Sequence, residues 1–205
     1  MEVISMDAKT VIKNYIGGKK WTWIVGLILF VVGIPTLMVG VGGILMLVGF
    51  IFLLIGLCAD VPANSNAKKT LAALESKGLL DKVAAEMTGP NKRVIGKDRA
   101  ILTENFLVIK RTGRVVALNS VVWAYKYRLT QRVFLIPVNV QDSLWIGDGV
   151  KAPCQMLAMG GKDKNDELKE VMLAMYNRNP RVLLGFTPEN QNAYKMIRQQ
   201  NKNRV

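Results

Sequence analysis

The chain has no histidine and only two cysteines, Cys58 and Cys154, among its 205 residues. Without histidine, the Ser-His-Asp and Cys-His nucleophile systems and zinc sites of the histidine type are excluded. The two cysteines lie far apart in the sequence, in unlike settings, so we expect free thiols in a reducing compartment rather than a disulfide framework. Several common kinds of catalytic and metal site are therefore ruled out.

Charge is absent from one long part of the chain. Between Trp21 and Ala59 there is no Asp, Glu, Lys or Arg, and the segment is rich in Leu, Val, Ile and Gly. One membrane-crossing helix needs roughly 20 residues, so this segment is too long for one upright helix and fits two. Pro35 and the glycines up to Gly43 favour a reversal between them. We predict a transmembrane helical hairpin over residues 21–59, with spans at Trp21–Val39 and Val41–Ala59.

Glycines recur every seven residues in both predicted helices. Seven residues are close to two helical turns, so each set forms a stripe on one face. Small residues let membrane helices approach closely, although glycine is frequent in such helices in any case. An antiparallel hairpin would place the two stripes in register, with Gly33 opposite Gly49. The predicted helix-packing seam consists of six glycines: Gly26, Gly33, Gly40, Gly42, Gly49 and Gly56.

Lysines flank the apolar segment on both sides. Lys19 and Lys20 precede it, Lys68 and Lys69 follow it, and nothing basic lies between the two spans. Because basic flanks stay in the cytoplasm, we predict a two-pass protein of the cell membrane with both termini cytoplasmic. Residues 1–20 repeat apolar side chains at intervals of three and four, as an amphipathic helix does. Such a helix would lie at the inner membrane interface; the alternative is a helix packed on the soluble domain or a frayed tail.

The rest of the chain changes from helical to β-type patterning. Val61–Ala67 is predicted as a linker and precedes a helix that Gly78 interrupts, which together make a segment over 60–91. From Lys92, short β-type runs predict a meander of about seven strands, with Arg128–Arg132 as a hairpin turn. The predicted fold class is α+β, with an antiparallel β domain over 92–186, a helix over 163–177, and a C-terminal helix and tail over 187–205.

Two stretches of the β domain carry a family resemblance. Ala100–Ile109 reads as a strand, a turn that begins at Thr103, and a second strand, and Gly113–Tyr125 continues into an aromatic strand. Over residues 92–177 this resembles bacterial pleckstrin-homology-like domains attached to membrane hairpins. The resemblance implies a small curved sheet closed by a helix and used for binding or assembly, without catalysis. The strand and helix after Arg181 depart from the family pattern, and the basic lipid-binding motif of its better-known members is not identifiable.

Candidate catalytic features are few. Gly160-Gly161-Lys162-Asp163 lacks the first glycine and the Ser/Thr of a phosphate loop, so it predicts a turn before a helix. Asp163, Asp166 and Glu167 suit the first turn of that helix, where acidic residues favour the helix dipole, rather than a metal site. Cys154 has no base nearby in the sequence. We predict no enzymatic activity, no metal and no cofactor.

Basic residues give the clearest indication of partners. The net charge is +13, and basic residues far outnumber acidic ones over 92–132. A surface of this kind is attracted to an anionic leaflet, although solvated charge with the usual cytoplasmic bias would give the same count. No nucleic-acid-binding motif is present, so nucleic acid is not predicted as a partner. The predicted membrane- or ligand-binding patch contains Lys92, Arg93, Lys97, Lys110, Arg111 and Arg114.

These observations give one functional hypothesis and two alternatives. The hypothesis is a membrane-anchored binding or scaffold protein whose basic cytoplasmic domain contacts anionic lipid or a protein partner. The first alternative is a subunit or regulator of a larger membrane complex, whose hairpin packs on partner helices. The second is an enzyme that acts on lipid head groups.

Overall fold

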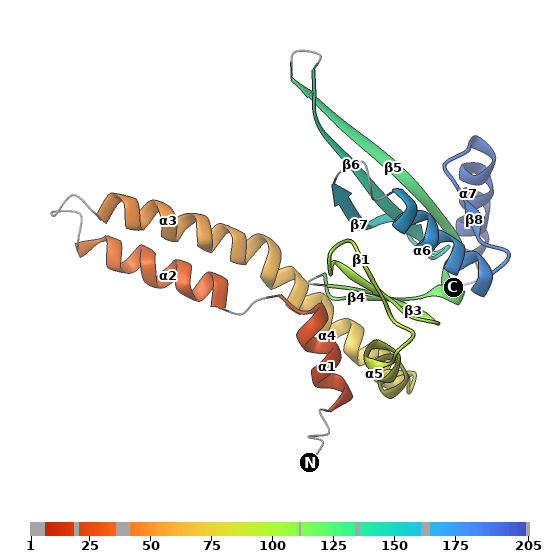
Figure 1. Cartoon of the computed structure of the whole chain (residues 1–205), viewed down its shortest axis with the longest axis horizontal. Coiled ribbons are helices and arrows are strands. Elements are labelled where there is room, and N and C mark those ends of the chain that lie inside the picture. The colour runs from red at the N-terminus through yellow and green to blue at the C-terminus, as the bar shows by residue number, and fades with distance from the viewer. Residues whose placement is uncertain are drawn as a thin grey trace. The chain divides into compact units, whose positions relative to one another are not determined.

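The computed structural model describes residues 7–18, 21–35, 42–110, 112–133, 136–160 and 165–203. The chain divides into two compact units. The helical unit contains Met1–Ala85 together with Lys110–Val115, and the β unit contains Glu86–Ile109 together with Val116–Val205. Figure 1 shows the helices and strands of both units.

Four helices make up most of the helical unit. They are α1 (Ala8–Ile16), α2 (Trp21–Gly33), α3 (Gly42–Ile55) and α4 (Val61–Ser76). A π-helical turn over Gly56–Asp60 joins α3 to α4, so Gly42–Ser76 is one continuous helix of 35 residues. By length and composition it is the one helix among the described residues that could cross a membrane, with a mean hydropathy of 2.7 in its most apolar window. The apolar part of α2, Trp23–Gly33, is shorter.

The predicted linker at Val61–Ala67 is wrong, because these residues form the first half of α4. The preceding π-helical turn, in which the Val61 N–H donates to the Gly56 carbonyl, leads directly into α4, and Pro62 lies in the first turn of α4, where a proline is tolerated. Asn64 does not cap a helix. Its side-chain oxygen accepts a hydrogen bond from the Gly18 N–H at 3.1 Å. Polar residues that look like a linker therefore serve the packing of one helix against its neighbour.

The N-terminal helix α1 packs on α4. Ile12 and Ile16 are fully buried in α1, and the facing α4 side chains Ala67 and Leu71 are buried as well. Asp7 caps the start of α1, where its carboxylate accepts from the Lys9 N–H. The structure shows this segment as a helix that packs on another helix, α4. After α4, Gly78 has a φ of +63° and separates it from α5 (Leu80–Thr88), as predicted.

The fold is α+β, with two four-stranded sheets. The first has the order β1-β2-β3-β4 and the second the order β7-β6-β5-β8, in which β8 runs parallel to β5. The strands are β1 (Arg93–Ile95), β2 (Ala100–Leu102), β3 (Phe106–Ile109), β4 (Arg114–Ala117), β5 (Trp123–Val133), β6 (Ile136–Gly147), β7 (Cys154–Gly160) and β8 (Leu183–Leu184). Two helices complete the chain, α6 (Asn165–Arg178) and α7 (Pro188–Lys202).

Alternation along β5 creates two apolar clusters in the β unit. Ala124 lies in the main core with residues of both sheets and of α6, including Leu107, Leu144 and Leu168. Its neighbours Trp123 and Tyr125 lie in a second cluster with Tyr194 of α7. The Tyr194 hydroxyl accepts from the Gly149 N–H at 3.1 Å and donates to the Lys151 carbonyl at 2.7 Å. The segment after Arg181 therefore supplies a cover for the aromatic face of the second sheet.

A carboxylate fixes the turn between β2 and β3. Glu86 accepts from the Thr103 hydroxyl at 2.7 Å, from the Asn105 side-chain amide at 2.6 Å and from the Asn105 N–H at 3.0 Å. Thr103 also accepts from the Phe106 N–H at 3.1 Å, which closes the turn that the resemblance is based on. This network holds the first sheet in a defined register.

The predicted hairpin turn at Arg128–Arg132 is wrong, because β5 continues to Val133 and pairs with β6 from Ile136 onward. Arg128 lies directly opposite Asp142 in the ladder, and the two side chains form an ion pair. Because Arg128 and Asp142 neutralise each other, both strands can contain a charged residue without ending there, although the sequence pattern alone predicts a turn. Ile136–Gly147 forms the single strand β6.

Candidate functional site

Four glycines line the contact between α2 and α3, which run side by side in Figure 1. A Cβ added at Gly26 would lie 2.5 Å from the Leu53 backbone nitrogen, and one at Gly49 would lie 2.5 Å from that of Phe30. One at Gly56 would lie 2.5 Å from the Trp23 Cβ, and Gly33 is similarly close to Met46. A Cβ at Gly43, by contrast, would meet nothing within 4 Å. The predicted seam residue Gly40 lies outside the described residues.

The register of the two stripes differs from the prediction. Gly33 faces Met46 and the carbonyl of Gly42, not Gly49, and Gly49 faces Phe30 and the carbonyl of Gly26. Each of these glycines therefore contacts the backbone of a residue that lies between two glycines of the other helix. Two opposed glycines would leave a void, whereas the offset fills that space with backbone and with the Met46 side chain.

The segment Lys110–Val115 is part of the helical unit, and Gly113 fixes it there. The Gly113 N–H donates to the Ile16 carbonyl at 2.8 Å, and its carbonyl accepts from the Thr70 hydroxyl at 2.6 Å. Gly113 has a φ of +70°, and a Cβ there would lie 2.5 Å from the Ala63 carbonyl oxygen. Only glycine combines this conformation with so close an approach to α4.

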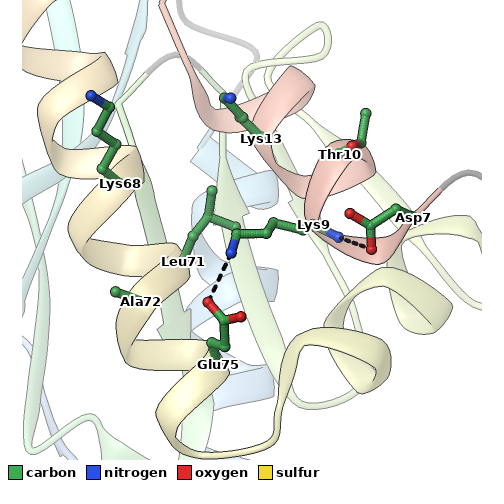
Figure 2. Close-up of a pocket in the computed structure, with 8 residues that line it drawn as sticks. All are labelled: Asp7, Lys9, Thr10, Lys13, Lys68, Leu71, Ala72 and Glu75. Carbon is green, nitrogen blue, oxygen red and sulfur yellow. Dashed lines mark hydrogen bonds and ion pairs between the residues drawn. The ribbon is translucent and has the colours of Figure 1, made fainter.

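Figure 2 shows a pocket between α1 and α4, with a volume of about 240 Å³. The Lys9 ammonium forms an ion pair with Glu75 at 2.9 Å on its wall. This hydrogen bond, and the charge of Glu75, raise the pKa of Lys9. Lys13 and Lys68 also line the pocket, and within the described part of the chain neither has an ion-pair partner. The pocket combines exposed positive charge with an apolar floor at Leu71, which suits an anionic group attached to an apolar one.

The predicted basic patch is divided between the two units. Lys92, Arg93 and Lys97 belong to the β unit, whereas Lys110 and Arg114 belong to the helical unit. Within the β unit, Lys92 and Arg93 lie at the start of β1 and Lys97 lies in the turn after it.

Two of these side chains are engaged by neighbours. Arg93 forms an ion pair with Glu170 of α6, and the Lys110 ammonium lies 5.5 Å from the centre of the Tyr15 ring. Arg111 lies outside the described residues. A count of charges along the sequence does not reveal such partners.

Asp142 is a site that the sequence analysis missed. Its side chain is 2% exposed, and Arg128 donates to both carboxylate oxygens, at 2.7 and 2.9 Å. The hydrogen bonds from Arg128 lower the pKa of Asp142, against the opposing effect of burial. The sequence indicates this site only by the presence of one acidic residue, Asp142, within a run of strand-forming residues. The pair holds β5 and β6 in register and indicates a structural role.

We expect the stability of the β unit to depend on Asp142 in acid. Its folded-state pKa lies below the usual 3.8, so its stabilisation is fully present above about pH 4 and is lost as the pH falls through the folded-state value. Asp142→Asn should lower the free energy of unfolding at pH 7 by about 2 kcal/mol, since Arg128 is half exposed and can be rehydrated. It should also flatten the decline below pH 4. Urea unfolding followed by tryptophan fluorescence measures both, and Asp166→Asn, at an exposed position of α6, should change neither.

The other predicted features have ordinary settings. Asp166 and Glu167 lie in the first turn of α6, where Glu167 accepts from the Gly96 N–H and Asp166 pairs with Lys169. Asp163 lies outside the described residues. Neither Cys58 nor Cys154 forms a disulfide in the described part of the chain. No group of three or more His, Cys, Asp or Glu placed to hold a metal occurs in the described part of the chain.

Comparison with family models, with curated proteins and with solved structures finds no match to this chain.

Proposed function

We propose that this chain is a non-enzymatic, membrane-anchored binding or scaffold protein whose hairpin α2–α3 crosses the cell membrane twice. The observation that carries the proposal is the surface of that hairpin. Its outward side chains are large and apolar, and several are more than half exposed, among them Ile28 at 55%, Ile44 at 65% and Leu47 at 62%. Only 18% of the most apolar window of Gly42–Ser76 is buried, which supports a helix that faces lipid over the core helix of a soluble protein. A bilayer supplies the cover that such a surface needs.

The packing inside the hairpin favours an anchor over a subunit that docks on partner helices. Association of membrane helices relies on small residues that allow close approach. Gly26, Gly33, Gly49 and Gly56 are all used within the hairpin, and large aliphatic side chains face outward. This arrangement leaves lipid as the natural neighbour of the outer surface.

The β unit supports a binding role. The strands β1 to β4 and β5 to β7 each follow the chain order, β8 is added parallel to β5, and α6 packs on the core that both sheets share; this small sheet domain supports the proposal. We propose that basic residues near the membrane end contact anionic lipid or a protein partner. Lys13 lies in the last turn of α1, where its carbonyl accepts from the Gly17 N–H, and the next residue, Gly18, lies against Asp60 at the end of the apolar segment, so Lys13 is about 10 Å from that end. That distance is within the reach of an anionic leaflet at physiological salt.

Cysteine labelling in intact cells tests the two-pass topology. Single cysteines at Lys13→Cys and Lys77→Cys, in a background without Cys58 and Cys154, should both be shielded from a membrane-impermeant thiol reagent. A cysteine at Thr36, which lies in the sequence between the end of α2 and the start of α3, should react from outside. Labelling of only one of the two cytoplasmic positions would contradict the hairpin topology.

Purification of the full-length chain in mild detergent tests the binding role. We expect anionic lipids to co-purify and to be lost in the double variant Lys13→Glu and Lys68→Glu. A stoichiometric set of partner membrane proteins, without anionic lipid, would favour the subunit of a larger complex instead. The full chain is needed because a fragment from Lys68 onward would lack Ile16 and Ala63, which hold Gly113 in place.

A further inference from the structure

The β5–β6 hairpin continues beyond the sheet to which it belongs. In the described part of the chain, β7 pairs with β6 only as far as Gln141, and β8 pairs with β5 only at Trp123 and Ala124. Past these points the two strands pair with each other alone, ending with Val133 opposite Ile136. We call residues 130–133 and 136–140 the β arm, and we call its last described pair, Val133 and Ile136, the tip. Figure 1 shows it projecting as a narrow two-stranded ribbon from the rest of the β unit.

The end of the β arm is apolar by residue type. Val133, Ile136, Pro137 and Val138 occupy described strand positions, and Arg132 is the single charged residue between Leu129 and Gln141. A two-stranded ribbon cannot cover side chains on both of its faces by itself. Residues of this type at the end of such a ribbon therefore suit an apolar environment outside the chain.

Both edges of the β arm carry features that oppose the addition of another strand. In the β arm, β5 carries Arg132, β6 carries Pro137, and the ladder shifts register between Gln131 and Arg132. Charged residues, proline and bulges are the means by which natural edge strands avoid pairing. Pairing with the same edge of a second copy would also bring like charges together. Contact through the tip is favoured over contact along an edge.

Polarity changes along the β5–β6 hairpin in the order found at a membrane surface. At the base of the arm, Tyr127 is 45% exposed, and Arg128 beside it neutralises the buried Asp142. Arg132 follows, and then the apolar end. Aromatic and basic residues favour the headgroup level, whereas apolar residues favour the acyl boundary. Arg132 directly precedes Val133, which pairs with Ile136 at the end of the described ladder, so about 3 Å of strand separates Arg132 from Val133, within an interfacial depth of about 5–10 Å.

We infer that the tip of the β arm inserts shallowly into an anionic lipid bilayer, with Arg132 at the level of the head groups. The inference rests on the proposed membrane anchoring, because tethering raises the effective concentration of lipid around the β unit. Insertion stops at the interface, since the unpaired edges of the ribbon cannot enter hydrocarbon. The tip is a second contact with lipid, in addition to α2 and α3, and gives the β unit a preferred orientation toward the bilayer.

The test uses the full-length chain in vesicles of phosphatidylcholine and phosphatidylglycerol, in a background without Cys58 and Cys154. A nitrobenzoxadiazole dye is attached to a single cysteine, Val133→Cys or Ile136→Cys, and the lipids carry a nitroxide either near the head group or deep in the acyl chain. We expect a blue shift of the emission and stronger quenching by the shallow nitroxide than by the deep one. The matched control, Asn119→Cys, lies at an exposed position of the β unit and should show neither.

Further arms of the experiment separate the remaining outcomes. Arg132→Glu should remove most of the quenching at the tip, and so should vesicles without phosphatidylglycerol. A tip dye that is not quenched overturns the inference; if the chain still resists carbonate extraction, the proposed anchoring stands. A blue shift without quenching places the tip against protein, such as a second copy, and also overturns it. A chain that carbonate extracts removes the basis of both proposals.

Discussion

Replacing Gly49 by leucine should separate α2 from α3, whereas the same replacement at Gly43 should leave the hairpin intact. A Cβ at Gly49 would lie 2.5 Å from the Phe30 backbone nitrogen and 2.8 Å from the Gly26 carbonyl oxygen. Both obstacles are helix backbone, so no change of rotamer relieves the clash and the helices must move apart. At Gly43 a Cβ would meet nothing within 4 Å, so leucine adds only apolar surface that lipid accepts.

The expected effect is graded along the seam. Gly26→Leu should behave like Gly49→Leu, because its Cβ would meet the backbone of Leu53 and the carbonyl of Gly49. Gly33→Leu should be milder, since the nearest atom is the Cγ of the flexible Met46 side chain and the nearest backbone atom, the Met46 nitrogen, is 2.9 Å away instead of 2.5 Å. Overpacking typically costs 1–3 kcal/mol, so we expect a loss of about 3 kcal/mol at Gly26 and Gly49 and about half of that at Gly33.

Titration of the purified protein with SDS in mixed micelles, followed by circular dichroism, measures the free energy of unfolding of each variant. Gly43→Leu is the matched control because it adds the same side chain to the same helix. Equal losses at Gly26, Gly33, Gly43 and Gly49 would show that the close approach of the two helices does not determine the stability of the hairpin.

Features set by neighbouring residues could be predicted from the sequence. The seven-residue glycine spacing, the break at Gly78 and most strands of the first sheet depend on local pattern and turn chemistry, and the structure shows each of them. The register between the two glycine stripes depends instead on which side chain fills the space between them. Met46 does so, and nothing in the spacing of glycines identifies it.

The wrong predictions share one physical cause, which is a distant partner. Val61–Ala67 has the composition of a linker, but Asn64 binds Gly18 and the small residues Ala63 and Ala67 admit Gly113. Residues 128–132 have the composition of a turn, but Arg128 pairs with Asp142 across the ladder. In both cases polar or small residues satisfy a tertiary contact, while local pattern reports only that they are polar or small.

The candidate site shows the same limit. Charge density over 92–132 indicated a basic surface, yet Arg93 is paired with Glu170, and the segment that carries Lys110 and Arg114 belongs to the helical unit. Lys13 and Lys68, which have no ion-pair partner in the described part of the chain, were not predicted as site residues, because their common pocket requires α1 to pack on α4. That packing follows from the apolar stripe of α1, which the sequence did contain.

Gly113→Ala should release the segment Lys110–Val115 from the helical unit, with a loss of about 4 kcal/mol. Alanine at positive φ costs about 1–2 kcal/mol in any setting. At Gly113 its Cβ would also clash with the backbone of Ala63 and Ala67, which cannot move without breaking α4. The segment must withdraw, and with it the hydrogen bonds to Ile16 and from Thr70, worth about 1 kcal/mol each.

Gly78→Ala separates the conformational cost from the loss of docking. Gly78 has a φ of +63°, close to the +70° of Gly113, but a Cβ there would meet nothing within 4 Å. It should therefore lose only about 1 kcal/mol, and Thr70→Val, which removes a single hydrogen bond, should be similarly mild. Trypsin reports the docking directly, because Lys110 and Arg114 lie in the segment that is released. Gly113→Ala should be cut there much faster than the other two variants, and equal rates in all three would show that Gly113 does not hold this segment against α4.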